Sequence, residues 1–260
     1  MSLEPMKNSS NIVALAVLCA VGLTVGCSKT DKSEKVFVMV PKGVHPYYEP
    51  CYEGFKDAAL KFGVKTEYRA AKAFEVPQQV EIIENLIARR VTGIAVSALD
   101  DQGLVPAIKE AMASGIKVIT FDAPAPSSAA LTYIGTMNET AGYSAGEALA
   151  KYMNDEGEVA VLQGGLGAPN LNDRFRGFEK ALKEKSPKVK IVAREDEQGK
   201  IDITVNKTEA LLEAHPNLKA IFSGSAEGVP GAVAVLKERS KTNIILAGFD
   251  DLPDTLAGIR

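Results

Sequence analysis

The chain has 260 residues, of which 46% are hydrophobic and 24% are charged, and its net charge at pH 7 is −3. This length and composition suffice for a globular body with one or two hydrophobic cores. The sequence has no basic patch and no interleaving of aromatic with basic residues, so no nucleic-acid partner is expected.

The N-terminal segment contains an uncharged apolar run over Asn11–Val25. This run is too short and too rich in small residues for a transmembrane helix, and it fits the apolar region of a signal peptide. It ends at Gly26-Cys27, before a polar stretch, and so resembles the lipobox of bacterial lipoproteins. We expect a lipoprotein signal peptide over residues 1–27, with Cys27 lipidated, and a tether over residues 28–35. The alternative is an ordinary signal peptide with a chance cysteine.

Strands and helices alternate in the first half of the remaining chain. The strands are short β-branched runs, and the helices show apolar residues at helical spacing. The expected order is strand Val36–Val40, helix Tyr52–Phe62, strand 66–69, helix Val76–Arg90, strand Gly93–Ser97, helix Gln102–Ser114, and strands Val118–Asp122 and Leu131–Gly135.

The same alternation then begins again. The expected elements are helix Thr140–Met153, strand Val159–Leu162, helix Asn172–Glu184, strand 190–193, helix Ile203–Ala214, strand Ala220–Ser223, helix Val229–Arg239 and strand Ile244–Phe249. Two successive halves of this kind predict an α/β protein with two doubly wound parallel-sheet lobes. Ligands of such sheets bind beyond the carboxyl ends of the strands, so the site is expected in the cleft between the lobes.

Polar and aromatic side chains follow several of these strands and suit a sugar. Aromatic rings pack on the apolar face of a sugar ring, and Tyr47 and Tyr48 are the candidates. Carboxylates accept hydrogen bonds from hydroxyl groups and guanidinium groups donate to them, so Asp122, Arg174 and Asp250 are the candidate polar contacts. Taken singly, each strand-end aspartate fits a helix cap or a turn equally well.

The chain from Val36 onwards resembles the periplasmic sugar-binding proteins of the ribose-binding class, which share a fold with the ligand domain of the lactose-repressor family. The resemblance rests on the order and spacing of several segments: Glu53-Gly54-Phe55, Val118–Asp122, Asp173–Phe178, His215-Pro216 and Gly248-Phe249-Asp250. It implies a type I periplasmic binding protein fold, with an N-terminal lobe over residues 36–136, a C-terminal lobe over residues 137–260 and a hinge between them.

The resemblance also implies roles for individual residues. It assigns a polar contact to His45, aromatic contacts to Tyr47 and Tyr48, and polar contacts to Asp122, Arg174, Ser225 and Asp250. Three positions depart from the ribose-binding pattern: Ala123 replaces an arginine, Ser225 replaces an asparagine, and Gln198-Gly199 stands where the family has an aromatic residue. These departures lead us to expect a modified or deoxy sugar, or a related polyol, rather than ribose.

Other segments are similar to the autoinducer- and rhamnose-binding branch. These are Val38–Lys42 and the stretch from Val96 to Lys109. In that branch the lysine after the first-strand proline contacts the ligand, which implies a site role for Lys42. Asp173, next to Arg174, is implied in the same way.

The resemblance ends before the family pattern does. After Asp250 the family continues with a further hinge strand and a return helix of the first lobe, whereas this sequence ends at Arg260. We therefore expect a C-terminally truncated chain.

Function follows from the resemblance as an expectation. The chain is expected to capture a sugar-like molecule outside the cytoplasmic membrane, as a periplasmic or cell-surface lipoprotein and a monomer, and to deliver it to an ABC permease. A signalling or chemotaxis receptor would use the same fold and site, and that alternative stays open.

An enzyme is not expected, and neither is a cofactor. Gly164-Gly165-Leu166-Gly167 follows a strand but lacks the spacing of a dinucleotide-binding loop. His45 and His215 lie in different halves, so no histidine-based metal site is expected. Cys51 is the only cysteine after Cys27 and fits a half-buried helix residue.

Overall fold

The computed structural model describes residues 34–259. The predicted signal peptide over residues 1–27, its lipidation site Cys27 and most of the predicted tether lie outside the described residues. Within residues 34–259, no helix is both long enough and apolar enough to cross a lipid bilayer.

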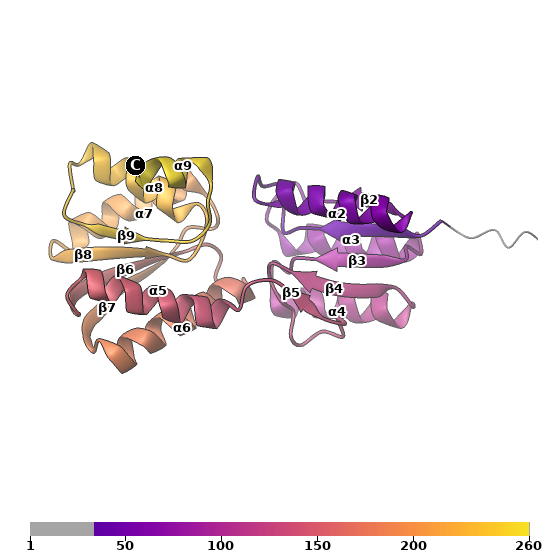
Figure 1. Cartoon of the computed structure of the whole chain (residues 1–260), viewed down its shortest axis with the longest axis horizontal. Helices are drawn as coiled ribbons and strands as arrows, with labels where there is room; N and C mark the ends of the chain where they lie inside the picture. Colours follow the sequence, from indigo (N-terminus) through magenta and orange to yellow (C-terminus); the bar gives the residue numbers. More distant parts are fainter. Residues whose placement is uncertain (1–33, 260) are drawn as a thin grey trace, which may run out of the picture. The chain divides into compact units, whose positions relative to one another are not determined.

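The first half of the described chain forms a five-stranded parallel sheet with the strand order β2-β1-β3-β4-β5 (Figure 1). Side chains of β1, β3 and β4 pack with those of two helices, α3 and α4, in one buried cluster. The elements are β1 (Val36–Val40), α2 (Tyr48–Phe62), β2 (Lys65–Tyr68), α3 (Val76–Ala88), β3 (Gly93–Val96), α4 (Asp101–Ala113), β4 (Lys117–Phe121) and β5 (Tyr133–Ile134).

The second half forms a four-stranded parallel sheet with the strand order β7-β6-β8-β9. Two buried clusters pack against it, and in one of them the rings of Phe178 and Phe222 stack with centroids 4.0 Å apart. The elements are α5 (Asn138–Tyr152), β6 (Glu156–Gln163), α6 (Pro169–Lys185), β7 (Lys188–Asp196), α7 (Ile201–Ala214), β8 (Leu218–Ser223), α8 (Gly228–Glu238), β9 (Ile245–Ala247) and α9 (Pro253–Ile259).

The predicted pair of parallel α/β sheets is confirmed. Most predicted helices agree with the structure to within two residues at each end, and three helices depart further. Helix α2 begins at Tyr48 rather than Tyr52, because Pro50 falls in the first turn, where a helix needs no N–H donor. Helix α6 begins at Pro169 rather than Asn172 for the same reason. Helix α9 was not predicted. The predicted lobe boundary between residues 136 and 137 falls between β5 and α5, and it stays a prediction.

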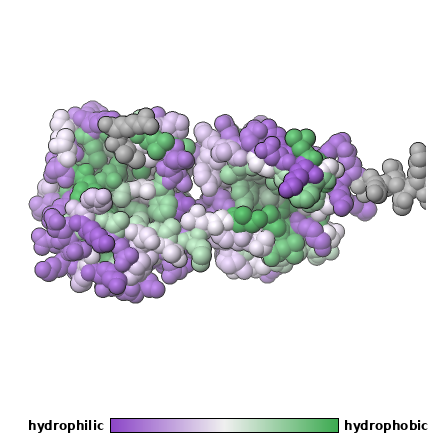
Figure 2. All heavy atoms as spheres, viewed as in Figure 1, coloured by the Kyte–Doolittle hydropathy of each residue, from purple (hydrophilic) through white to green (hydrophobic). Residues whose placement is uncertain are grey.

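Helix α6 is strongly amphipathic. It buries Leu171, Arg174, Phe178 and Leu182, which recur at the three- and four-residue spacing of one helix face. Hydrophilic side chains cover its outer surface (Figure 2). Arg174 is the one charged residue among the buried residues of α6.

Helices α5 and α6 touch backbone to backbone. A Cβ atom added at Gly177 would overlap the carbonyl oxygen of Glu139, and one added at Gly142 would overlap the carbonyl oxygen of Arg174. Only glycine permits this approach, which fixes the height of Arg174 relative to the first turn of α5.

We expect Gly177→Ala to destabilise the protein by at least about 1–3 kcal/mol, because the added methyl group must push α5 away from α6. Gly54→Ala in α2 is the matched control. No atom lies within 4 Å of its added Cβ, so the change should stabilise by about 0.5–1 kcal/mol through helix propensity. Urea unfolding midpoints measure both, and a neutral Gly177→Ala would contradict the backbone contact.

Candidate functional site

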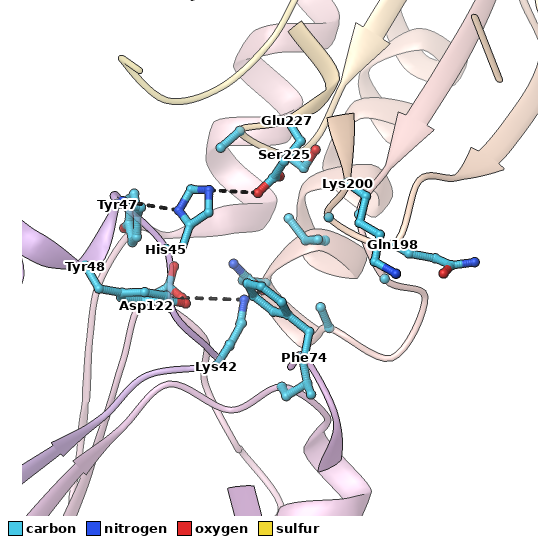
Figure 3. A pocket seen from close by; sticks show the side chains of 18 of the residues that line it. Lys42, His45, Tyr47, Tyr48, Phe74, Asp122, Gln198, Lys200, Ser225 and Glu227 are labelled. Carbon is cyan, nitrogen blue, oxygen red and sulfur yellow. Dashed lines mark hydrogen bonds and ion pairs between the residues drawn. The ribbon is translucent and has the colours of Figure 1, made fainter. Parts of the chain in front are cut away.

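A cavity of about 640 Å³ lies where loops from both sheets meet (Figure 3). Its walls come from segments that follow the carboxyl ends of the strands, as expected for parallel α/β sheets. Eight of the nine predicted ligand residues line it: Lys42, His45, Tyr47, Tyr48, Asp122, Arg174, Ser225 and Asp250.

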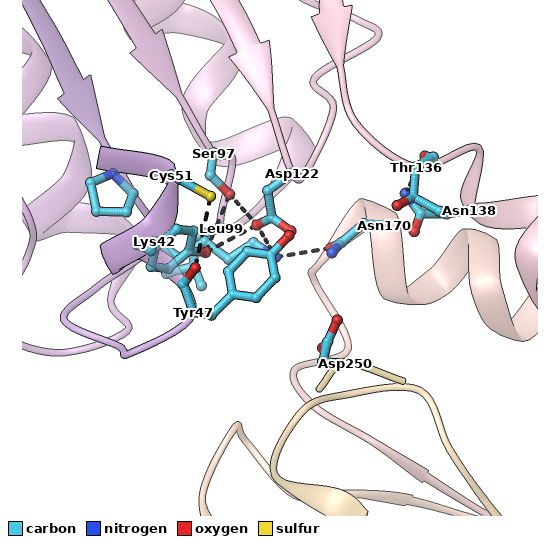
Figure 4. A network of polar contacts seen from close by, with 12 residues as sticks. Lys42, Tyr47, Cys51, Ser97, Leu99, Asp122, Thr136, Asn138, Asn170 and Asp250 are labelled. Carbon is cyan, nitrogen blue, oxygen red and sulfur yellow. Dashed lines mark hydrogen bonds and ion pairs between the residues drawn. The ribbon is translucent and has the colours of Figure 1, made fainter. Parts of the chain in front are cut away.

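Asp122 follows β4 and is the acidic centre of the first-sheet wall (Figure 4). Its Oδ2 accepts hydrogen bonds from Ser97 Oγ at 2.6 Å and Tyr48 Oη at 3.0 Å, and it lies 3.5 Å from Lys42 Nζ. Burial by itself would raise the pKa of this carboxyl, but Lys42 and the two hydroxyl groups outweigh burial and hold the pKa below its ordinary value. Among the described residues, Oδ1 has no hydrogen-bond partner, so it is free to accept from a ligand hydroxyl.

Lys42 follows β1 and connects the two walls of the cavity. Its Nζ donates to Asn170 Oδ1 at 2.9 Å, and Asn170 lies in the first turn of α6. Burial lowers the pKa of the ammonium, and the neighbouring Asp122 opposes that shift. A ligand that enters the cavity therefore meets a buried cation already shared between the two sheets.

A second contact between the walls joins His45 to Glu227, which lies just before α8. His45 Nδ1 accepts from the backbone N–H of Tyr47 at 3.1 Å, so the proton of the neutral ring is assigned to Nε2. Nε2 then donates to Glu227 Oε1 at 3.0 Å. Burial by itself would raise the pKa of Glu227, but the hydrogen bond and electrostatic attraction of His45, a backbone N–H and the charge of Lys42 together outweigh burial and lower the pKa.

Tyr47 and Tyr48, the two predicted aromatic contacts, have different roles in the structure. Tyr48 is almost fully buried, and its hydroxyl group is committed to Asp122, so it chiefly supports that carboxylate. Tyr47 is half-buried and packs edge-on against Tyr48 with ring centroids 5.2 Å apart. Phe74, from the loop before α3, adds a second exposed ring to the lining.

Arg174 is the cationic centre of the second-sheet wall, and only 5% of it is exposed. Its Nε donates to Asn138 Oδ1 and its Nη1 to the carbonyl oxygen of Gly224, both at 2.8 Å. The guanidinium carbon lies 4.2 Å from the centroid of the Phe249 ring, and Nη1 lies 4.0 Å from Asp250 Oδ2. Among the described residues, Nη2 has no hydrogen-bond partner, which leaves a donor for the ligand.

Ser225 is held from behind by a buried carboxyl group. Its Oγ donates to Glu197 Oε1, and Thr204 Oγ1 donates to Glu197 Oε2 at 2.6 Å. Burial raises the pKa of Glu197 to about 8, and the nearby carboxylates of Glu227 and Asp196 add to the rise. Burial likewise raises the pKa of Asp250.

Asp173 is the one predicted ligand residue that does not line the cavity. It precedes Arg174 in α6, and consecutive helical residues point about 100° apart. When Arg174 faces the cavity, Asp173 therefore faces outwards, and its Oδ1 accepts from Arg176 Nη2 at 2.6 Å.

Several residues that line the cavity were not predicted as ligand contacts, among them Asn170, Phe74, Lys200 and Glu227. Asn170 was not recognised because helix α6 was predicted to begin at Asn172, which left Asn170 in the preceding turn. Glu227 follows the predicted strand Ala220–Ser223, so its strand-end position was the available signal. Phe74 and Lys200 belong to loops without a motif.

Within residues 34–259, no cluster of three or more histidine, cysteine, aspartate or glutamate side chains is arranged to hold a metal ion. The polar side chains of the cavity come from several separate segments around its walls, and such groups fix the orientation of a bound small molecule.

The Glu197 carboxyl makes stability depend on pH. The folded state keeps its proton up to about pH 8, whereas the unfolded chain loses it near the ordinary value of 4.5. Stability should therefore fall as pH rises between these values, by on the order of 1 kcal/mol per pH unit from this group. Glu197→Gln should remove that part of the slope.

Urea unfolding at pH 5, 6, 7 and 8 measures the difference between the variant and the wild type. Glu67→Gln in β2 of the other sheet is the control, because the pKa of that carboxyl is lowered to about 2 and it contributes no slope in this range. A Glu197→Gln curve parallel to the wild type would contradict the assignment.

Comparison with known proteins agrees with this geometry. The protein-family model described as periplasmic binding protein domain matches residues 36–260 of this chain. The ribose import binding protein RbsB of Escherichia coli K12 is 26% identical over 248 residues, which are 94% of this chain and 82% of that protein.

Solved structures are similar over most of the chain. An ABC transporter solute-binding protein from Burkholderia graminis C4D1M, in complex with D-arabinose, is 40% identical with a TM-score of 0.83, over 86% of this chain and 79% of that one. GanP, a glucose-galactose binding protein from Geobacillus stearothermophilus, is 32% identical with a TM-score of 0.83, over 87% and 81%. The predicted type I fold is thereby confirmed, and the chain belongs to the periplasmic binding protein family.

Proposed function

We propose that this protein is an exported solute-binding protein that captures a neutral sugar or polyol in the cavity and delivers it to an ABC permease. The observation that carries the proposal is the balance of charge around the cavity. Four basic and four acidic side chains line it: Lys42, Lys72, Arg174, Lys200, Glu75, Asp122, Glu227 and Asp250. A ligand with a net charge would leave one sign of this set unmatched.

Hydroxyl groups suit these walls because each one both donates and accepts. Asp122 Oδ1 can accept from a hydroxyl group, and Arg174 Nη2 can donate to one. Hydrogen bonds to charged groups are about twice as strong as those between neutral groups, so a few of them suffice to orient a small ligand. The exposed faces of Tyr47 and Phe74 supply the apolar contact that a sugar ring needs.

The names of the relatives support the same class of ligand. RbsB is named for ribose, the Burkholderia protein was solved with D-arabinose, and GanP is named for glucose and galactose. These proteins are named as binding proteins, and we propose that this chain likewise binds its ligand without turning it over. A modified or deoxy sugar, or a polyol, remains our proposed ligand.

Export and anchoring complete the proposal. The apolar run before Cys27 would direct the chain across the cytoplasmic membrane, and a lipid on Cys27 would hold it at a membrane surface through the polar tether. The soluble part would act as a monomer and present its ligand to the permease.

Ligand binding would favour a closed arrangement because the ligand contacts both walls at once. The hydrogen bonds Lys42–Asn170 and His45–Glu227 already join the walls, so a ligand adds to existing contacts. The energy for transport would be supplied at the permease, not by this chain.

A thermal-shift screen of the soluble part against pentoses, hexoses, deoxy sugars and polyols tests the proposal. A ligand at one hundred times its dissociation constant adds about 2.7 kcal/mol, which corresponds to about 5–10 °C for a chain of this size. No shift with any member of the panel, from a folded protein, would contradict a sugar or polyol ligand. Tight binding of ribose would contradict the preference for a modified or deoxy sugar.

Arg174→Ala should weaken binding of the best ligand at least about 30-fold, because it removes a buried, hydrogen-bonded charge that faces the ligand. Arg176→Ala is the matched control, since Arg176 lies on the same helix but pairs with Asp173 outside the cavity. Calorimetric titration gives both dissociation constants, and equal affinities for the two variants would overturn the site.

A further inference from the structure

A chain of hydrogen bonds connects the two charged centres of the cavity through the segment between the sheets. The Tyr133 hydroxyl, from β5, directs its one proton towards two carbonyl oxygens, that of Asp122 at 2.8 Å and that of Thr136 at 3.0 Å. The same hydroxyl oxygen accepts from Asn138 Nδ2 at 3.2 Å, and Asn138 Oδ1 accepts from Arg174 Nε at 2.8 Å. Two side chains therefore link Asp122 in the first sheet to Arg174 in the second.

Asn138 is buried, and its side-chain amide makes three hydrogen bonds. Besides its bonds to Tyr133 and Arg174, its Nδ2 donates to the carbonyl oxygen of Thr136 at 2.9 Å (Figure 4). An asparagine at a helix start ordinarily caps the backbone N–H groups of that helix. Here Asn138 is the first residue of α5, and its side-chain Oδ1 accepts a hydrogen bond from the Arg174 guanidinium instead. Helix capping thus does not account for it.

Asp122 needs external support because its backbone is in an unfavourable conformation. Its φ angle is +57°, a value that residues other than glycine adopt rarely. Strand β5 holds it on both sides, since the Asp122 N–H donates to the Ile134 carbonyl oxygen at 3.2 Å and its carbonyl oxygen accepts from Tyr133. The aspartate that faces the ligand is therefore set by the strand that leads to α5.

We propose that Tyr133 and Asn138 are positioning residues that set the Asp122 carboxylate and the Arg174 guanidinium relative to one another, so that the two walls meet the ligand as one unit. The inference rests on the proposed function, because it assigns a role in the same cavity. Neither residue lines the cavity, so neither would be found by inspecting its walls.

The decisive variant is Tyr133→Phe, which keeps the ring and removes the hydroxyl group. Tyr133 has no hydrogen bond to Arg174, and the hydrogen-bonded route from its hydroxyl group to the Arg174 Nε–H runs through Asn138. We expect the Arg174 Nε–H proton, followed by ¹⁵N side-chain NMR without ligand, to exchange faster with water than in the wild type. Affinity for D-arabinose, or for the best sugar of the screen if D-arabinose does not bind, should fall about 3- to 10-fold.

Asn138→Ala should have the larger effect on both measurements, because it removes the direct acceptor of Arg174 Nε–H. Tyr143→Phe is the matched control. Its hydroxyl group donates to Glu184 at 3.0 Å on the exposed side of α5, about one and a half turns from Asn138, and its loss should change neither measurement because it belongs to no part of the Tyr133–Asn138–Arg174 chain. Thermal unfolding confirms that each variant is folded, and Tyr133→Phe keeps the test valid if Asn138→Ala does not fold.

The outcomes separate this inference from the proposed function. If the wild type binds a sugar but Tyr133→Phe matches Tyr143→Phe in affinity and in Arg174 Nε–H exchange, the positioning role is wrong. If the wild type binds no sugar, the proposed function fails, and the exchange measurement still decides whether Tyr133 acts on Arg174. A merely structural role for Tyr133 would lower the melting temperature and leave Arg174 Nε–H exchange unchanged.

Discussion

The guanidinium of Arg174 is buried, and the residues of the second-sheet wall are placed so that they surround and hydrogen-bond this charge. A buried charge is costly unless it is hydrogen-bonded or paired. Its partners come from separate parts of the fold: Asn138 at the start of α5, Gly224 after β8, and Phe249 and Asp250 after β9. The backbone contact between α5 and α6 brings the first of them within reach. Moving any of these elements would leave the cation partly unsatisfied.

The central charged residue of the first-sheet wall, Asp122, has the opposite sign to Arg174 and is held in a similar way. Asp122 collects Lys42, Ser97 and Tyr48 on one carboxylate oxygen and leaves the other one open. Arg174 likewise leaves one nitrogen open. Each wall is therefore satisfied in all but the atoms that a hydroxyl group would reach, which is how a site can discriminate in favour of a ligand that completes it.

Such an arrangement gives specificity rather than stability. Buried ion pairs often contribute little to folding, because desolvation offsets their attraction. Ser225 is held by Glu197, and burial of that carboxyl group raises its pKa, so its ionised form is destabilised in the folded protein. A ligand that bonds to these groups returns part of that cost, so binding and stability are expected to rise together.

The sequence predicted the parts of the fold and site that depend on local pattern. Alternating strands and helices predicted both sheets, and strand-end positions predicted Asp122, Arg174 and Asp250 as neighbours. The prediction of Asp173 was wrong because consecutive residues of a helix point about 100° apart, so Asp173 and Arg174 cannot both face the cavity.

Other parts of the site depend on tertiary contacts that leave no local signal. Glu197 reads as one more polar loop residue, and only its burial distinguishes it. In the sequence, Tyr133 is a residue of a predicted strand, and Asn138 lies two residues before the predicted helix Thr140–Met153. Their roles emerge only when β5, α5 and α6 are assembled. Phe74 reaches the cavity from a loop whose path no periodicity predicts.

We propose that one small neutral ligand is held between Asp122 and Arg174. The most direct test is a crystal structure of the protein with the sugar that gives the largest thermal shift. We predict that sugar hydroxyl groups lie within hydrogen-bond distance of Asp122 Oδ1 and Arg174 Nη2, with Tyr47 or Phe74 against the ring. A sugar bound elsewhere, or one that contacts only one of the two sheets, would contradict this account.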